Sequence, residues 1–421
     1  MDESPCRGHD RDAEFETILR CRLLYPVYQP IVVLATGKVA GYEALIRGPA
    51  GSAFESPAAL FGQALRTGRL GELDWAARAM AFRRALQAGL PYEMPLFVNV
   101  EPATLRTRCP SDLTASIDAG AERLQVVAEV TERFLGADPA ALMMLMARVR
   151  GRGARMALDD VGSNPASLAL MSLLNPEVIK LDRGIVQHPG TTVADQVVRA
   201  VRAQSARTGA IVLAEGIETP HHRATALAMG ATHGQGWLFG RPGPLPARHE
   251  PPGPYLPRGT WPSARDATPF EIVNGHRDAT RATKQTLIPV STRLETMASR
   301  APEAMVLLAA FQHDAHFGAR VRARYAAWAD DGAFIAVFAH GITPGPAPRL
   351  RGVPLAADDP LVGEWTLIVM DSYFAGGLLA RELPTTAGSE LHRQFDAIVT
   401  YDRALLAEAA HSLLERLDRH P

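Results

Sequence analysis

Polar side chains that can bind metals or move protons recur between residues 43 and 235, each at or just past the end of a short apolar run. They are Glu43, Asn99, Glu129, Asp159, Asp160, Lys180, Glu215, Glu218 and Gln235. A single carboxylate in such a position is usually a solvated loop charge or a helix N-cap. Recurrence after successive apolar runs instead favours one shared site that combines acids, amides and a lysine.

Carboxylates gathered in one place repel one another and take up protons unless cations neutralise them. Oxygen ligands from Asp, Glu and Asn suit hard ions such as Mg²⁺ or Mn²⁺, whereas zinc sites more often contain His or Cys. Two such ions roughly 3.5–4 Å apart can bridge a water, lower its pKa and stabilise the attacking and leaving oxygens at phosphorus. These residues therefore predict phosphodiester hydrolysis with two divalent cations, Mg²⁺ or Mn²⁺.

The elements that must position these residues alternate in type. Short β-rich runs such as LFVNV, RMALDDV, VIKLD and AIVLAEGI are separated by amphipathic stretches at 74–90, 139–150, 192–207 and 220–230. Seven or more such units in ~240 residues predict an α/β fold closed into a (β/α)8 TIM-like barrel, whose strand ends meet at one mouth. An open doubly wound sheet is the alternative, but it favours a glycine-rich turn after the first strand, and none is present there.

A proline-rich segment divides the chain, with eight prolines between residues 242 and 262. Proline fixes φ and has no N–H, so this segment favours an extended connector. We predict a first domain at 14–245, a linker at 246–265 and a second domain at 266–421. Apolar runs and helical segments alternate in the second domain, which predicts a smaller open α/β fold of four or five strands.

The amino-acid composition and charge limit the classes of binding partner that we expect. The 421 residues are 47% hydrophobic and 21% charged, with 44 Lys plus Arg against 45 Asp plus Glu. Such a chain can bury large cores, and its charge balance gives no sign of polymeric nucleic acid or an anionic membrane as a partner. The amino terminus is polar and no apolar run approaches ~18 residues, so we expect a cytoplasmic protein without a membrane span.

At the residues named above the chain resembles the EAL family of cyclic di-GMP phosphodiesterases. The resemblance is carried by YQPIV at 28–32, EALIR at 43–47, FVNVEP, VVAEVTE, LDD, VIKLD, AEGIE and GQGWLFGRP. It implies an EAL-type barrel, hydrolysis of cyclic di-GMP to linear pGpG, and a homodimer. An alternative is a receptor that binds cyclic di-GMP without hydrolysing it, although such receptors usually lack several of these residues. A different metal-dependent barrel enzyme would require the ordered motifs to be accidental.

The resemblance also implies a role for each motif residue. Asp159 bridges the two metal ions, whose ligands and close neighbours are Glu43, Asn99, Glu129, Asp159, Asp160 and Glu218. Lys180 orients the attacking water or a phosphate oxygen, and Glu215 is a candidate general base. Glu132 supports the loop after the paired aspartates. The residues implied in substrate binding are Gln29 on a guanine edge, Arg47 on a phosphate, and Gln235.

The loop after the paired aspartates departs from the family pattern. Many members read DDFGxGYSSL, whereas this chain reads DDVGSNPASL from Asp159 to Leu168. Pro165 fits the first turn of the following helix with Asn164 as a cap, which predicts a stiffer loop. Because this loop contributes to dimerisation in the family, the change bears on the rate, the regulation and the mode of dimerisation.

From about Thr268 the chain resembles the DICT domain, a sensory module that occurs with diguanylate cyclases and two-component proteins. This resemblance implies signal input through a ligand or protein partner that the sequence does not identify. Candidate residues for that surface are His313, His316, Glu364, Trp365 and Phe374. Two histidines three residues apart can contribute to a metal site, but the sequence identifies no third ligand, and we assign no site there.

Overall fold

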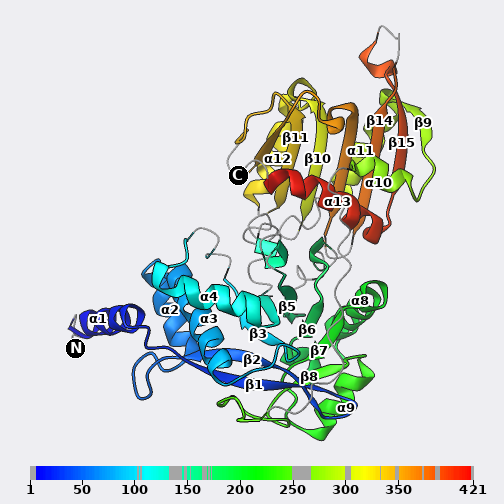
Figure 1. Cartoon of the computed structure of the whole chain (residues 1–421). Coiled ribbons are helices and arrows are strands. Elements are labelled where there is room, and N and C mark those ends of the chain that lie inside the picture. The colour runs from blue at the N-terminus through cyan, green and yellow to red at the C-terminus, as the bar shows by residue number, and fades with distance from the viewer. Residues whose placement is uncertain are drawn as a thin grey trace, which may run out of the picture. The chain divides into compact units, whose positions relative to one another are not determined.

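The fold is given by a computed structural model of the whole chain (Figure 1). The described residues are all except 1–5, 102–103, 105–106, 132–144, 147–148, 152, 164–167, 169–170, 172, 249–266, 299–304, 332, 347–349, 372–373, 385–388 and 419–421. For residues 6–10, 298 and 418 only the backbone is described.

The chain forms two compact units. One comprises residues 1–131, 144–163 and 176–259, and the other comprises residues 132–143, 164–175 and 260–421. The predicted linker at 246–265 falls almost entirely outside the described residues, so the boundaries at 245 and 266 stay a prediction.

Eight strands of the first unit close into a barrel in chain order, which confirms the predicted fold class. They are β1 (Tyr25–Val33), β2 (Val39–Arg47), β3 (Leu96–Asn99), β4 (Val126–Thr131), β5 (Arg155–Val161), β6 (Val178–Leu181), β7 (Ile211–Ala214) and β8 (His233–Gln235). Strands β2 to β8 each run parallel to the next, whereas β1 is antiparallel to both β2 and β8.

The antiparallel first strand differs from a fully alternating (β/α)8 barrel, and the length of its connection explains why. Only residues 34–38 join β1 to β2, and the N–H of Gly37, at φ 73°, donates to the carbonyl of Val33 across 2.8 Å. A parallel connection needs a dozen or more residues. The first two strands therefore form a hairpin, with no helix between them.

The named helices of this unit lie before β1 and in the connections β2–β3, β3–β4, β6–β7 and β7–β8. They are α1 (Cys6–Arg20), α2 (Pro57–Arg66), α3 (Leu70–Gln87), α4 (Ser111–Arg123), α7 (Arg183–Gln187), α8 (Thr192–Thr208) and α9 (Pro220–Ala228). The side chains of Ser56, Thr191 and Thr219 cap α2, α8 and α9 by accepting a backbone N–H in the first turn. Helices α3, α8 and α9 match predicted amphipathic stretches, whereas most of the stretch at 139–150 lies outside the described residues.

One apolar cluster contains a single residue from each of six barrel strands. Its members are Ile31, Phe97, Val127, Ala157, Val178 and Leu213. Side chains alternate between the two faces of a strand, so residues two positions from each member point to the same side of the barrel wall. Six of the polar residues predicted for the site stand at those positions: Gln29, Asn99, Glu129, Asp159, Lys180 and Glu215.

The second unit is built on a seven-stranded sheet of order β12-β11-β10-β13-β14-β15-β9, with β10, β11 and β12 parallel and the other pairs antiparallel. The strands are β9 (Thr280–Thr283), β10 (Val306–His313), β11 (Phe334–His340), β12 (Arg351–Leu355), β13 (Glu364–Met370), β14 (Ala375–Glu382) and β15 (Gln394–Thr400). The open α/β fold is as predicted. The expected strand number was too low because β9 (TRAT) and β12 (RGVPL) lack a long apolar run.

Helices of the second unit lie on both faces of its sheet (Figure 1). They are α10 (Pro269–Asn274), α11 (Lys284–Ala298), α12 (Ala319–Asp330) and α13 (Arg403–Asp418). A Cβ added at Gly376 would meet Leu294 of α11, and one added at the next residue, Gly377, would meet Leu406 of α13. Because neighbouring residues of a strand face opposite ways, α11 and α13 cover opposite faces.

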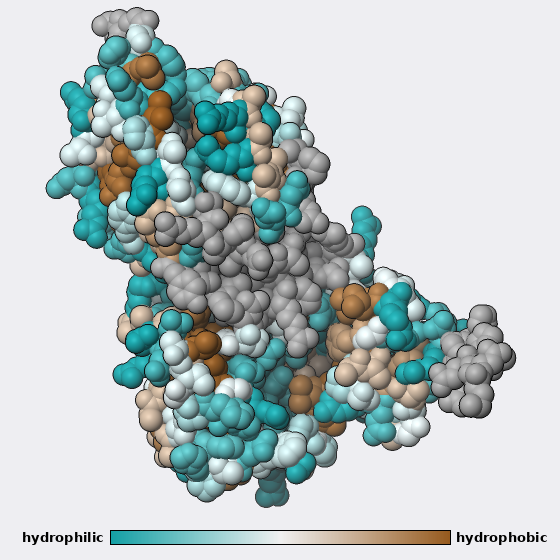
Figure 2. Space-filling view, turned by 180° about the vertical axis from the view of Figure 1, so that it is seen from behind, coloured by the Kyte–Doolittle hydropathy of each residue, from teal (hydrophilic) through white to brown (hydrophobic). Residues whose placement is uncertain are grey.

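The coloured part of the face drawn in Figure 2 is largely hydrophilic. On the face drawn in Figure 2, hydrophobic residues form separate small patches among hydrophilic ones. Within the part of the chain that the structure describes, no helix is both long enough and apolar enough to cross a membrane.

Candidate active site

The barrel strands carry polar residues two positions after members of the interior apolar cluster. The pairs are Phe97 with Asn99, Val127 with Glu129, Ala157 with Asp159, Val178 with Lys180, and Leu213 with Glu215. The N–H of Glu215 continues the ladder by donating to the carbonyl of Leu181 across 3.1 Å. An apolar layer therefore underlies a polar one, and the polar layer lies at the carboxyl ends of the parallel strands, where barrel enzymes carry their chemistry.

Lys180 is the centre of this polar layer. Its Nζ lies 2.6 Å from Glu129 Oε1, 2.9 Å from Asp159 Oδ1, 2.8 Å from Glu215 Oε1 and 3.7 Å from Glu43 Oε2. The lysine side chain is 1% exposed. Four carboxylates on four different strands or strand ends thus surround one buried ammonium, and we call these five residues the acidic cup.

The charges in the acidic cup do not balance. Burial lowers the pKa of Lys180, but the four surrounding carboxylates hold it well above its usual value. Burial and the nearby Glu43 raise the pKa of Glu129 well above its usual range. Burial also raises the pKa of Glu215 to about 8, against the opposing effect of Lys180. One ammonium cannot neutralise four carboxylates, so the cup must bind protons or further cations.

The donor atoms fit divalent cations. Carboxylate oxygens of Asp159, Asp160 and Glu215 all lie within 4.8 Å of one another. The Oε2 atom of Glu129 is buried and has no hydrogen-bond partner among the described residues. Buried carboxylate oxygens are normally paired or bound to metal, and an all-oxygen set suits Mg²⁺ or Mn²⁺.

Asp160 reaches the same site as Asp159 because the strand ends irregularly between them. Consecutive residues of a regular strand point to opposite faces. Asp160 instead has φ 56°, in the left-handed region, and the register of β5 with β6 shifts between Leu158 and Val161. Non-glycine residues in this region are uncommon and concentrate at functional sites. The strained backbone turns two adjacent carboxylates toward one site.

Two glutamines complete one side of the cup. Gln235 Nε2 donates to Glu43 Oε2 across 2.6 Å and to Gln29 Oε1 across 3.0 Å. Gln29 Nε2 in turn donates to the carbonyl of Gly240 across 3.1 Å. The antiparallel pairing of β1 with both β2 and β8 brings these residues together. The sequence predicted both glutamines as substrate contacts, and the fold adds that Gln235 links Gln29 to a predicted metal ligand.

Three other predicted residues, Asn99, Arg47 and Glu218, form no hydrogen bond or ion pair with Lys180 in the part of the chain that the structure describes. The Arg47 guanidinium donates to the carbonyl of Ile46, and burial lowers its pKa while Glu43 raises it. The Glu218 carboxylate lies 4.0 Å from Arg183. Glu132 and residues 164–167 of the altered loop lie outside the described residues.

Asp74 on α3 is a supporting residue that the sequence analysis missed. It is 1% exposed, its Oδ1 accepts the N–H of Glu101 across 3.2 Å, and its Oδ2 lies 2.8 Å from Arg78. Burial raises the pKa of Asp74 to about 6, and Arg78 opposes that rise. Glu101 follows Asn99 by two residues, so Asp74 anchors the chain just after a predicted ligand. A carboxylate four residues before an arginine, inside the apolar part of an amphipathic helix, was the available signal.

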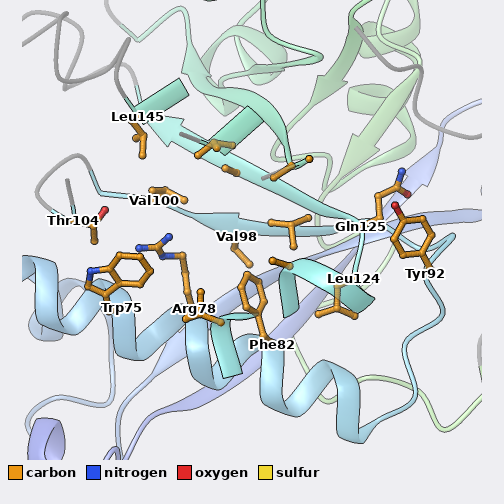
Figure 3. Close-up of a pocket in the computed structure, with 17 residues that line it drawn as sticks. Trp75, Arg78, Phe82, Tyr92, Val98, Val100, Thr104, Leu124, Gln125 and Leu145 are labelled. Carbon is orange, nitrogen blue, oxygen red and sulfur yellow. The ribbon is translucent and has the colours of Figure 1, made fainter. Parts of the chain in front are cut away.

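A separate cavity of about 270 Å³ lies on the flank of the barrel. Figure 3 shows Trp75, Arg78 and Phe82 of α3 facing Val98 and Val100 across it. The Arg78 guanidinium lies over the Trp75 ring, 4.2 Å from its centroid. None of the predicted site residues lines this cavity, so the acidic cup is the better candidate for catalysis.

Comparisons with known protein families match both units. A family model described as the EAL domain matches residues 13–242. A second model, described as a sensory domain in diguanylate cyclases and two-component systems (DICT), matches residues 273–383.

Curated relatives match the first unit. The cyclic di-GMP phosphodiesterase RocR of Pseudomonas aeruginosa is 30% identical over 229 residues, which are 53% of this chain and 57% of RocR. The probable cyclic di-GMP phosphodiesterase PdeN of Escherichia coli is 29% identical over 241 residues, 55% of this chain and 46% of PdeN. The uncharacterized protein y4lL of Sinorhizobium fredii is 32% identical over 225 residues, 52% of this chain and 27% of y4lL.

The chain thus spans between 27% and 57% of the length of these relatives. Among solved structures, a PaMucR phosphodiesterase in complex with cyclic di-GMP is 25% identical with a TM-score of 0.48, covering 55% of this chain and 96% of that one.

Proposed function

Because the chain belongs to the EAL domain family and carries a C-terminal DICT sensory domain, we propose that it hydrolyses cyclic di-GMP to linear pGpG with two divalent cations. The observation that carries the proposal is the acidic cup, in which Lys180 lies within 2.6–2.9 Å of three carboxylates. Relatives named as cyclic di-GMP phosphodiesterases, RocR among them, support the choice of substrate.

Some residues of the site would bind the two metal ions, and the others would act on the reactants. One ion would be held by Glu43, Asn99, Glu129 and Asp159, and the other by Asp159 and Asp160 with Glu218 close by. When bound, the two Mg²⁺ or Mn²⁺ ions supply Lewis acidity and lower the pKa of the attacking water.

The remaining residues orient the reactants. Water adds to one phosphorus of the cyclic dinucleotide, the bond from that phosphorus to its 3′ oxygen breaks, and the 3′ oxygen takes up a proton. Glu215 accepts the proton of the attacking water, and Lys180 Nζ donates a hydrogen bond to that water or to a phosphate oxygen. Arg47 binds a substrate phosphate, and Gln29, held by Gln235, contacts a guanine edge.

A second candidate function is a cyclic di-GMP receptor without hydrolytic activity. The observation in its favour is the altered loop after Asp160, which lacks the phenylalanine, the second glycine and the tyrosine of DDFGxGYSSL. Against it stands the full set of carboxylates and the lysine. The proposed hydrolase function also includes regulation of the hydrolysis by the DICT domain and formation of a homodimer.

The test is an assay of the purified chain with cyclic di-GMP and either Mg²⁺ or Mn²⁺, with the product separated by chromatography. We expect pGpG from the wild type and a loss of at least ~100-fold in rate in Glu43→Gln. The matched control is Glu122→Gln, an exposed glutamate on α4, which should retain the wild-type rate. Nucleotide binding without pGpG formation under either metal supports the receptor and rejects the hydrolase.

A further inference from the structure

Three histidine rings converge in the second unit, at the carboxyl ends of two parallel strands. His313 ends β10, His316 closes the 3₁₀ turn η4 (Asp314–His316), and His340 ends β11. His313 and His340 are register partners across the two strands. The ring of His313 lies 5.8 Å from that of His316 and 5.7 Å from that of His340, centroid to centroid. The fold therefore supplies the third imidazole that the sequence did not identify.

In two of the rings Nδ1 is occupied, which leaves Nε2 as the nitrogen that can face an ion. His316 Nδ1 lies 3.0 Å from the carbonyl oxygen of Phe311, and His340 Nδ1 lies 3.1 Å from that of Leu355. A carbonyl oxygen can only accept a hydrogen bond, so each Nδ1 carries a proton, and because Arg393 Nη1 donates to His316 Nε2, that nitrogen carries the lone pair. An Nδ1–H bond to a backbone carbonyl is the usual outer contact of a metal-binding histidine.

The backbone that presents His313 is strained. Gln312 has φ 63° and is 4% exposed, and the register of β10 with β11 shifts between Ala310 and His313. Left-handed conformations of non-glycine residues cost of order 1–3 kcal/mol and concentrate where a side chain must be aimed. A bulge at the end of β10 therefore sets the direction of His313.

We propose that His313, His316 and His340 bind a divalent transition-metal ion of the zinc class, with water in the fourth position. Three neutral imidazoles suit Zn²⁺, Co²⁺, Ni²⁺ or Cu²⁺ and do not suit Mg²⁺. Among the described residues only the carboxylate group at Asp159 has three ligand atoms within 4.8 Å of one another. Binding therefore requires the exposed His313 and His340 rings to rotate, which is fast for surface side chains, and His340 then gives up its present bond to the carbonyl of Leu355.

Metal binding at this site competes with an arginine. Arg393 Nη1 donates to His316 Nε2 across 3.1 Å, and Arg393 also bonds to Gln312 Oε1 at 2.8 Å and to Glu382 Oε1 at 2.7 Å. The lone pair of His316 Nε2 cannot serve both the arginine and an ion. The ion therefore releases Arg393 from His316 and perturbs the contacts between β10, β14 and the start of β15. Metal binding would thus change the contacts between strands of the sensory unit. The proposed metal site does not depend on the proposed hydrolysis.

The test is a titration of the full chain with Zn²⁺ by calorimetry, in excess Mg²⁺ so that the acidic cup is already filled. The same titration with Co²⁺ reports nitrogen coordination through the visible spectrum. We expect one ion per chain at this site, and at least ~100-fold weaker binding in His313→Ala and in His340→Ala, since loss even of an outer contact costs 10–100-fold. Both residues are exposed, and unchanged thermal unfolding of the metal-free variants verifies that they fold.

The matched control is His276→Ala. His276 is exposed in the same unit and its Nδ1 lies 3.1 Å from the carbonyl of Ile272, but it belongs to no cluster. It should bind Zn²⁺ as the wild type does, and Arg393→Gln should bind it more tightly. Wild-type affinity in both His313→Ala and His340→Ala, or an equal loss in His276→Ala, overturns the proposal.

Discussion

The acidic cup and the three-histidine cluster both lie at the carboxyl ends of parallel strands, yet they differ in every property that governs metal choice. The cup is buried, made of carboxylates and neutralised in part by Lys180. The histidine cluster is made of imidazoles, and two of its three members are exposed. Burial makes the charges of the cup interdependent, whereas each exposed histidine acts nearly alone. The same topological position thus carries two different ligand sets, one for the proposed catalysis with hard cations and one for the proposed binding of softer ones.

The largest expected effect comes from removing the central ammonium of the cup. Lys180→Met should abolish hydrolysis and lower the free energy of unfolding of the metal-free chain by about 3 kcal/mol or more, because it leaves buried carboxylates uncompensated. Urea denaturation in EDTA measures the loss, and added Mg²⁺ should restore part of it. If Lys180→Met and wild type unfold at the same urea concentration in EDTA, the carboxylates are not held as charged groups around this lysine.

The second effect is a dependence of the stability of the chain on pH, which bound metal should reduce. Burial raises the folded-state pKa of Glu215 to about 8, above the unfolded value near 4.5, so the folded metal-free chain retains a proton that the unfolded chain loses. The contribution of Glu215 is therefore fully present below about pH 4.5 and is lost as pH rises to 8, by roughly a few kcal/mol.

Thermal unfolding in EDTA between pH 5 and 8 tests this. The decline with pH should be shallower in Glu215→Gln and in wild type with Mn²⁺, since either a neutral amide or a cation removes the need for the proton. An identical decline in Glu215→Gln would show that another group is responsible.

A smaller effect on activity is expected from substitution of Asp74, which holds the chain just after the predicted ligand Asn99. Asp74→Asn keeps the size of the side chain but weakens its bond to the Glu101 N–H and its ion pair with Arg78. We expect roughly 10-fold weaker activation by Mn²⁺ with little change in the KM for cyclic di-GMP. A rise in KM at unchanged metal dependence would mean that Asp74 supports the nucleotide rather than the metal ligands.

The smallest effect on stability is expected in the histidine cluster, and it distinguishes this exposed cluster from the buried acidic cup. In metal-free protein, His313→Ala should change the free energy of unfolding by less than about 0.5 kcal/mol, as is usual for exposed positions. The contrast with Lys180→Met is the point of the comparison. Destabilisation of the two variants by similar amounts in EDTA would contradict the distinction between a buried and a solvated cluster.

The barrel and most of the cup could be predicted from the sequence, because each apolar run ends in one chemically distinctive residue and parallel strand ends converge. Glu129, Asp159 and Lys180 follow that rule directly. The hairpin of β1 with β2 was not foreseen, since its turn is five residues of ordinary polarity and the alternation of strands and helices was read as uniform.

What the sequence could not reveal are contacts between residues far apart in the chain. Asp74 lies on a helix that carries no motif, and its bond to Glu101 exists only once α3 packs against β3. His340 is 24 residues beyond His316, and only the register of β10 with β11 brings the rings together. The pairing of Gln235 with Gln29 likewise depends on closure of the barrel through β1 and β8.

The central claim, that the acidic cup performs metal-dependent hydrolysis, is tested most directly by single-turnover formation of pGpG as a function of Mn²⁺ concentration. We expect no pGpG in EDTA, a steep rise as two ions bind, and no product at any Mn²⁺ concentration in Lys180→Met. Cyclic di-GMP that remains bound and intact at saturating Mn²⁺ in the wild type would contradict it.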